Sequence, residues 1–338
     1  MTRPVVTVTR RLPPAVESRL KASFDARLND TDVPLAAAAL SHALATSDAL
    51  ISTLGDPLNA AVLHAATLPT AVLHAATLPG SYAVRTKCIA HFGVGYDNID
   101  IAVARELGIT VTNTPGVLTD DTADLAMLLM LATARRAGEG ERELRAGHWS
   151  GWRPTHLLGT RVSGKTLGIV GFGRIGRALA ARARDGFGMR VLAWSRSLTE
   201  KEATDAGVTH CASLEALLET SDFVSVHVPS THHTRHLINA ERLSRMRPGA
   251  FLINTARGDV VDEIALVTAL RAHLIAGAGL DVFEGEPAVR PELAEFPNVV
   301  LLPHIGSATL ETRTAMGMLA VDNLEAFFAG RDVPNPVA

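Results

Sequence analysis

The chain is poor in several features that would point to specialised classes of protein. It has 338 residues and only two cysteines, Cys88 and Cys211. These are too few and too far apart in sequence for a disulfide framework or a metal site, so no metal is expected and a reducing, cytoplasmic environment fits. The net charge of −3 gives no electrostatic footprint for nucleic acid or for an anionic membrane. Small molecules are therefore the expected partners.

Long hydrophobic runs are also lacking. The most apolar window, 125–134, is half as long as a membrane span requires, and the N-terminus carries charge without a following apolar segment. We therefore expect neither a membrane helix nor a signal peptide. Hydrophobic residues nevertheless make up 47% of the chain, which is enough to fill the cores of two domains.

Apolar strands alternate with helices along the chain, which implies parallel sheets with helical crossovers. We predict an α/β protein of two Rossmann-like or flavodoxin-like, doubly wound parallel-sheet domains separated by an active-site cleft. In the simplest topology, the helix that starts at Thr309 returns to the first domain. The substrate-binding domain would then be discontinuous, 1–113 with 305–338, and 114–304 would form the NAD(P)-binding domain.

A ten-residue segment is duplicated in tandem at 61–70 and 71–80, with nine identical positions. The period is too short and too rarely repeated for a solenoid. We interpret it as a surface helix or loop extension, in which His64 and His74 are solvated copies rather than metal ligands.

The strongest motif is glycine-rich and begins at Gly171. Gly171, Gly173 and Gly176 follow an apolar strand, 167–170, and open an Ala-rich helix, which is the context in which G-x-G-x-x-G binds a dinucleotide. The glycines allow a tight turn, a close approach of backbone to pyrophosphate, and close packing of helix on strand. The same turn places Arg174 and Ile175 at the cofactor.

The end of the next strand indicates which cofactor is preferred. NAD-binding domains carry an acidic residue there that bonds the ribose 2′-hydroxyl, but this chain has Ser195, Arg196 and Ser197. Arg196 and the two serines can bond a 2′-phosphate instead. We therefore expect NADPH, with NADH as the weaker alternative.

Three titratable or charged residues follow predicted strands, where ligands of such sheets bind. They are Arg257, Glu286 and His304. Reduction of a 2-oxo acid needs a cation for the carboxylate and a proton donor, which His can supply, and a bonded Glu would fix the imidazole tautomer. Taken singly, each also has a structural interpretation: an Arg257–Asp259 pair, a turn carboxylate, and a satisfied core histidine.

The glycine-rich loop 147–154 carries two of the three tryptophans. Exposed aromatic residues on a loop more often mark a contact than a core, so a subunit interface is the natural candidate.

At these residues the chain resembles the D-2-hydroxyacid dehydrogenase family, and especially its glyoxylate/hydroxypyruvate reductase branch. The matching segments span most of the chain in the family's order: 93–100, 113–119, the Gly171 loop, 254–261, 279–287 and 302–309. The duplication is a departure from the family pattern, and the absent strand-end aspartate supports NADPH.

The resemblance implies a role for each site residue. Arg257 would orient the substrate, His304 would be the general acid/base, and Glu286 would support it. The substrate would also meet Leu54, Val94, Gly95, Ser307 and, from the neighbouring subunit of a homodimer built on the cofactor domain, Trp152. The cofactor would meet Pro229, Thr255, Asp281 and Gly306. Glyoxylate and hydroxypyruvate are the expected substrates.

Other functions remain open at this point. Phosphoglycerate and phosphite dehydrogenases keep the Arg, Glu and His set, whereas formate dehydrogenases of the same fold carry Gln in place of Glu286. A non-enzymatic, cofactor-sensing corepressor of this fold can keep all three residues as well, although this chain shows no disordered regulatory tail.

Overall fold

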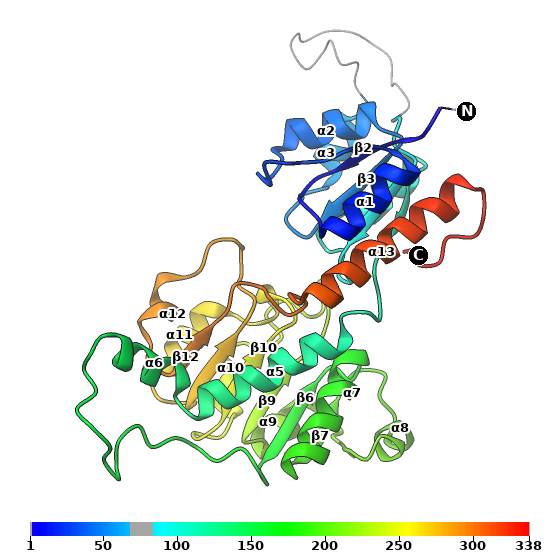
Figure 1. Ribbon diagram of the computed structural model, residues 1–338. Helices are drawn as coiled ribbons and strands as arrows, with labels where there is room; N and C mark the ends of the chain where they lie inside the picture. Colours follow the sequence, from blue (N-terminus) through cyan, green and yellow to red (C-terminus); the bar gives the residue numbers. More distant parts are fainter. Residues whose placement is uncertain (1, 68–83, 338) are drawn as a thin grey trace. The chain divides into compact units, whose positions relative to one another are not determined.

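The structure, a computed structural model, describes residues 2–67 and 84–337. The chain divides into two compact units, each built on its own sheet (Figure 1). Unit 1 comprises Met1–Leu118 with Ala308–Ala338, and unit 2 comprises Thr119–Ser307.

Unit 1 contains a five-stranded parallel sheet in the order β2-β1-β3-β4-β5. This is the strand order of flavodoxin-like folds. Its strands are β1 (Val5–Val8), β2 (Asp25–Arg27), β3 (Ala49–Thr53), β4 (Cys88–Phe92) and β5 (Thr110–Thr112). β3 is buried at four of its five positions and β4 at all five, as expected for parallel strands covered on both faces.

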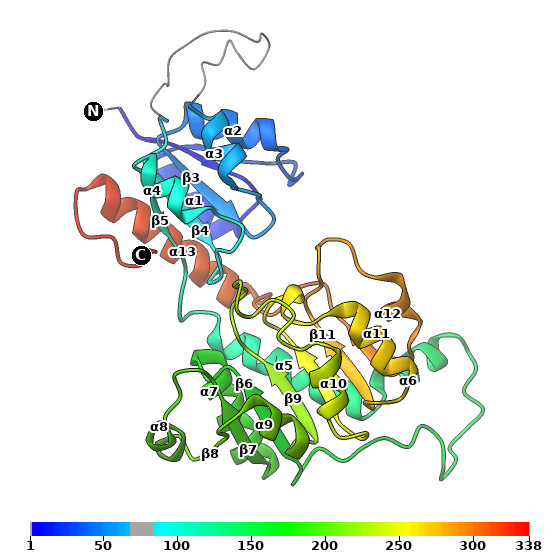
Figure 2. The same ribbon diagram turned by 180° about the vertical axis from the view of Figure 1, so that it is seen from behind.

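Helices cover both faces of this sheet. One face carries α1 (Pro14–Ser23) and α13 (Leu310–Phe328), which pack on each other (Figure 1). The other face carries α2 (Ala37–Thr46), α3 (Ala60–Ala65) and α4 (Ile101–Glu106), which can be seen in the reverse view of Figure 2. Because α13 belongs to this unit, unit 1 is formed from two separate stretches of chain.

The boundaries of the units differ by a few residues from the division made on the sequence. Residues 114–118 stay with unit 1, where the Thr114 N–H donates to the Gly93 carbonyl at 2.9 Å. Residues 305–307 stay with unit 2, because the Asp281 carboxylate accepts the N–H groups of Ile305 and Gly306.

Unit 2 contains a seven-stranded parallel sheet in the order β12-β11-β10-β9-β6-β7-β8. Its strands are β6 (Thr166–Val170), β7 (Arg190–Trp194), β8 (Thr209–His210), β9 (Phe223–Val226), β10 (Phe251–Asn254), β11 (Gly277–Leu280) and β12 (Val299–Leu301). The order reverses between β6 and β9, which is the switch point of the Rossmann arrangement.

The helices of unit 2 also form two layers. α5 (Thr119–Ala134) and α7 (Arg174–Ala181) pack together on one face, while α9 (Leu214–Thr220), α10 (Ala240–Arg245) and α11 (Glu263–Arg271) cover the other. The remaining elements are α6 (Ala137–Arg145), α8 (Glu200–Asp205), α12 (Pro291–Glu295), a π-helical turn (Arg182–Gly186) and a 3₁₀ turn (Gly258–Val260). None of the helices that the structure describes is both long and apolar enough to cross a membrane.

The start of the first copy of the duplicated segment is helical with an exposed His64, as interpreted, but it also contributes to the core of unit 1 and is not a mere surface extension. This part belongs to α3, and its Val62, Leu63 and Ala66 are buried in the core of unit 1. Apolar residues at helical spacing face the sheet here, while His64 on the other side of the helix is exposed. The second copy, with His74, lies outside the described residues.

Candidate active site

The glycine loop joins β6 to α7 at the switch point of unit 2. Gly171 has φ 96°, and a Cβ there would lie 2.7 Å from the carbonyl carbon of His227. A Cβ on Gly176 would meet the Gly171 carbonyl, whereas one on Gly173 would meet nothing within 4 Å. The first and third glycines thus allow close packing, and the second leaves open space at the N-terminus of α7. Arg174 and Ile175 form the first turn of that helix, so this edge fits a pyrophosphate.

The end of β7 lies next to this loop, because the Gly171 N–H donates to the Trp194 carbonyl at 2.8 Å. Arg196 and Ser197 follow in an exposed turn, and Ser195 is half-buried. The next carboxylates along the chain, Glu200 and Glu202, lie in the first turn of α8, where Glu202 is engaged in a capping box with Thr199. The strand end therefore presents a guanidinium and hydroxyl groups.

His304 and Glu286 form a direct pair in unit 2. His304 Nδ1 lies 2.7 Å from Glu286 Oε2, and the two side chains are 29% and 34% exposed. Burial raises the pKa of Glu286, but the hydrogen bond and the charge of His304 outweigh it, so the pKa lies below its usual value. An ionised carboxylate at Nδ1 makes Nδ1 the donor and leaves Nε2 to exchange a proton. Glu286 is therefore more than an isolated turn carboxylate.

The backbone of His304 is held by Asp281. The His304 N–H donates to the Asp281 carbonyl at 2.9 Å, and the Asp281 carboxylate accepts from Ile305 and Gly306 at 2.8 Å each. Asp281 is 1% exposed, and this burial raises its pKa against the opposing hydrogen bond from Ile305. His304 has φ 53°, a left-handed conformation that is costly for a histidine and that these bonds maintain. The sequence alone did not point to this anchoring role of Asp281.

Arg257 follows β10 and contributes to the charge around Glu286. Burial raises the pKa of Glu286, whereas the contacts with His304, the hydrogen bond from the Phe283 N–H and the positive charge of Arg257 lower it. Gly258, directly after it, packs so closely on Phe283 and Glu284 that an added Cβ would overlap their backbone. The Arg257 turn and the turn that leads to Glu286 are therefore held against each other.

One buried hydroxyl beside Arg257 is consistent with a bound cofactor. Thr255 is 8% exposed, and its Oγ1 has no hydrogen-bond partner among the described residues. A buried polar atom without a partner costs free energy unless a ligand satisfies it. Pro229 is exposed beyond β9, and the Gly306 N–H is already bonded to Asp281. The open space at Gly173 and the Thr255 hydroxyl together fit a dinucleotide.

The predicted substrate residues fall in both units. Leu54, Val94 and Gly95 follow β3 and β4 of unit 1 and are half-buried, whereas Ser307 is the last residue of unit 2. Trp152 is 82% exposed in the loop after α6.

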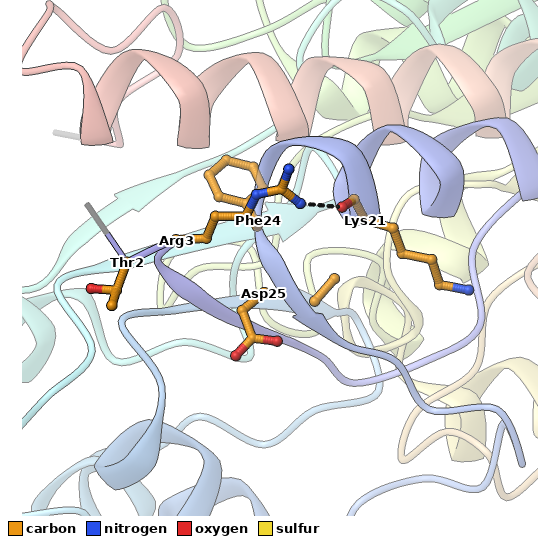
Figure 3. Close-up of a pocket in the computed structure, with 6 residues that line it drawn as sticks. Thr2, Arg3, Lys21, Phe24 and Asp25 are labelled. Atoms are coloured by element: carbon orange, nitrogen blue, oxygen red, sulfur yellow. Dashed lines mark hydrogen bonds between the residues drawn. The ribbon is translucent and has the colours of Figure 1, made fainter.

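The hollow drawn in Figure 3 does not coincide with these residues. It is lined by Thr2, Arg3, Lys21, Phe24, Asp25 and Ala26, and Arg3 donates to the Lys21 carbonyl at 3.1 Å (Figure 3). These residues lie where β1 and β2 begin. Ligands of open α/β sheets bind at the opposite, carboxyl ends of the strands, so this hollow is not part of the candidate site.

Comparisons with known proteins agree with this geometry. Residues 127–306 match the model of the "D-isomer specific 2-hydroxyacid dehydrogenase, NAD binding domain". The chain is 45% identical to the glyoxylate reductase of Korarchaeum cryptofilum, over 99% of this chain and 96% of that protein. It is also 45% identical to that of Thermococcus litoralis, over 99% and 97%.

A solved structure is similar throughout. The NADPH-dependent glyoxylate/hydroxypyruvate reductase of Sinorhizobium meliloti, in complex with NADP and malonate, superposes with a TM-score of 0.84. The two are 38% identical, over 100% of this chain and 97% of that one. Together with the Rossmann order of unit 2 and the paired His304 and Glu286, these similarities show that the chain is an NAD(P)-dependent oxidoreductase and belongs to the D-isomer specific 2-hydroxyacid dehydrogenase family.

Proposed function

We propose that the protein is an NADPH-preferring reductase of small 2-oxo acids, converting glyoxylate to glycolate and hydroxypyruvate to D-glycerate. The observation that carries this proposal is the 2.7 Å pair of His304 and Glu286 beside Arg257. The relatives named as glyoxylate reductases, and the Sinorhizobium meliloti enzyme named as a glyoxylate/hydroxypyruvate reductase, support the substrate class.

In this reaction the substrate ketone or aldehyde gains a hydride at C2 and a proton on oxygen. The reduced nicotinamide supplies the hydride when bound. His304 gives the proton from Nε2 to the forming alkoxide, and Glu286 stabilises the charged imidazole before the transfer. Arg257 orients the substrate through its carboxylate, and the backbone of Val94 and Gly95 binds the same group. Leu54 and Trp152 limit the size of the 2-substituent.

The preference for NADPH rests on the turn after β7. Arg196 is exposed there, between Ser195 and Ser197, where a 2′-phosphate would meet a guanidinium and two hydroxyls. The NADP-bound Sinorhizobium meliloti structure supports this assignment. Cys88 and Cys211 are buried, free thiols, which supports a cytoplasmic setting.

Initial rates with glyoxylate, hydroxypyruvate, pyruvate and phenylpyruvate, each with NADPH and NADH, test the proposal. Loss of absorbance of the reduced nicotinamide reports turnover. We expect the highest kcat/KM for glyoxylate and hydroxypyruvate with NADPH. Arg196→Gln should lower kcat/KM with NADPH about 10- to 100-fold, the cost of losing bonds to a charged phosphate, and change that with NADH little. A wild-type preference for NADH, or turnover confined to phenylpyruvate, would contradict it.

We also propose a homodimer built on unit 2. Four large apolar side chains of one segment are exposed, namely Leu144, Trp149, Trp152 and Leu158, at 54–82%. Several large apolar side chains exposed by one segment are typical of a contact surface. Sedimentation should give twice the chain mass, and the Trp149→Ser/Trp152→Ser double variant should shift towards the monomer. A monomeric wild-type protein at micromolar concentration would refute the dimer.

A further inference from the structure

The loop 93–96, which follows β4 in unit 1, has its carbonyl groups occupied by neighbouring parts of the same unit. The Gly93 carbonyl accepts the Thr114 N–H at 2.9 Å. The Val94 carbonyl accepts the side-chain amide of Asn113 at 2.8 Å. Asn113 and Thr114 are consecutive residues beyond β5, the strand next to β4, so both bonds pull the loop carbonyls towards the sheet.

The third carbonyl of the loop is held by a histidine. His91 is completely buried in β4, and its Nε2 lies 2.9 Å from the Gly95 carbonyl oxygen. Since a carbonyl can only accept, Nε2 carries the proton. The other ring nitrogen, Nδ1, lies 3.0 Å from Ser52 Oγ, and Ser52 is the cross-strand neighbour of His91 in the β3–β4 ladder. Ser52 therefore donates to Nδ1 and fixes the tautomer that holds Gly95.

These three bonds also determine where the loop N–H groups point. In a trans peptide, the C=O and the following N–H lie on opposite sides of the chain. The N–H groups of Val94, Gly95 and Tyr96 therefore point away from the groups that hold the three carbonyls. In the part of the chain that the structure describes, none of these N–H groups donates a hydrogen bond. Consecutive backbone donors of this kind bind anions.

Exposure increases along the loop in the same direction. Gly93 is buried, Val94 and Gly95 are half-buried, and Tyr96 is exposed. The donors therefore reach the surface of unit 1, while the imidazole of His91, which aligns the Tyr96 N–H, is buried away from solvent. A fixed, water-excluded partner holds its geometry better than a solvated one.

We propose that His91 is a positioning residue for the substrate carboxylate, which it serves by aligning the Tyr96 N–H as a further donor beside those of Val94 and Gly95. Asn113 aligns the Gly95 N–H in the same way, by holding the Val94 carbonyl of the same peptide group, and Ser52 sets the tautomer of His91. This inference rests on the proposed function, because a 2-oxo acid supplies the carboxylate.

Gly93 is the part of this arrangement that leaves room for the ring. A Cβ on Gly93 would lie 2.9 Å from His91 Nε2 and 3.2 Å from Leu54 Cδ2. The imidazole is fully buried and has no free space to move into, so an added methyl group would displace it from Gly95. Gly93→Ala is therefore expected to weaken the same donor as a change at His91.

The chain contains two tyrosines, Tyr82 and Tyr96, which makes the proposed donor directly observable. Protein labelled with ¹⁵N only at tyrosine gives two backbone amide signals, and the Tyr82→Phe variant identifies that of Tyr96. Oxamate, an unreactive carboxylate analogue of glyoxylate, should shift the Tyr96 signal in the cofactor-bound protein. Oxamide, which has no carboxylate, should leave it in place at the same concentration.

Kinetics separate positioning from a merely structural role. His91→Leu, which cannot donate to Gly95, should raise KM for the 2-oxo acid about 10-fold, the effect of one lost hydrogen bond to a charged group. Both kcat and the KM for NADPH should stay within about two-fold, because neither the proton transfer nor the cofactor involves this loop. His91→Gln keeps a donor at the position of Nε2 and should restore most of the substrate affinity.

The result at Tyr96 and the turnover assay have distinct consequences. Turnover and oxamate inhibition without a Tyr96 shift would overturn the inference and leave the proposed function standing. A Tyr96 shift in a protein that reduces no 2-oxo acid would support the anion-binding loop and overturn the proposed function. If His91→Leu does not fold, Gly93→Ala and Ser52→Ala provide the test, since the first displaces the imidazole from Gly95 and the second removes the donor that fixes its tautomer. A wild-type KM in all folded variants would refute the positioning role.

Discussion

Unit 2 presents charged side chains beyond its strands, whereas unit 1 presents backbone N–H groups after β4. Both units are parallel sheets covered by helices on both faces, and both orders follow the doubly wound pattern. In the proposed mechanism, the functional atoms of unit 2 are those of Arg257, Glu286 and His304, and the backbone serves to place them. In the proposed anion site of unit 1, the side chains of His91 and Asn113 are the supports, and the backbone N–H groups bind the ligand. Similar sheets can thus divide the tasks of proton transfer and anion binding.

The largest expected effect comes from removing the proposed proton donor of unit 2 while leaving the loop of unit 1 unchanged. His304→Asn keeps an amide N–H near the position of Nδ1, where it can bond Glu286, but it cannot transfer a proton, so kcat should fall about 100- to 10,000-fold. Oxamate should still shift the Tyr96 amide, because the donors of unit 1 are unchanged. Steady-state rates and the tyrosine-labelled spectrum measure the two effects. A kcat near the wild-type value would remove His304 from the proton transfer.

A smaller effect is expected from disturbing the contact between the Arg257 turn and the turn that leads to Glu286. In Gly258→Ala the added Cβ would overlap the backbone of Phe283 and Glu284, so the variant should lose about 1–3 kcal/mol of stability or more. All three tryptophans lie in unit 2, at 149, 152 and 194, so tryptophan fluorescence during urea unfolding reports on it. Gly249→Ala is the matched control, because a Cβ there meets nothing within 4 Å. Equal midpoints for the two variants would show that the turns are not in close contact.

The last prediction concerns the pH dependence that His227 gives to the stability of unit 2. Burial lowers the pKa of His227, next to Gly171, to about 4 from the ordinary value of 6.5. Below pH 6.5 the unfolded chain therefore takes up a proton that the folded chain does not. Stability should fall between pH 6.5 and 4 by up to about 1.4 kcal/mol per pH unit.

His227→Gln lacks this proton uptake. As the pH falls, the unfolding free energy of the wild type should therefore decrease more than that of the variant. Urea unfolding at several pH values measures it. Parallel pH dependences for the two proteins would mean that His227 titrates in the folded state as it does in the unfolded one.

Much of unit 2 could be predicted from the sequence because its determinants are local. Buried parallel strands appear as short apolar runs, and the strand predicted at 167–170 lies within β6, Thr166–Val170. A residue that directly follows such a run must lie at the carboxyl edge of the sheet, which is how Arg257 and His304 were found. The Glu286–His304 bond was expected from the chemistry of imidazole and is present at 2.7 Å.

What the sequence did not predict depends on contacts between distant segments. β2 has only three residues and alternating exposure, so no apolar run marks it. The role of Asp281 in holding 304–306 depends on the neighbouring strands β11 and β12. The His91–Gly95 bond could not be predicted from the sequence, because every residue has a backbone carbonyl and no residue type marks the one that accepts. The resemblance implied contacts of the substrate with Val94 and Gly95, but the side chains that support this loop are visible only in three dimensions.

The divided construction of unit 1 has a consequence for its biosynthesis. Unit 2, 119–307, is fully translated before the ribosome reaches α13, which packs on β4 and α1. The segment after α13 also returns to the loop supports, since the Asn113 N–H donates to the Asn335 carbonyl at 3.2 Å. All of unit 2 can therefore leave the ribosome while unit 1 still lacks a helix and an anchor. If unit 1 binds the substrate carboxylate as proposed, the nascent chain completes its cofactor-binding unit before its substrate-binding unit.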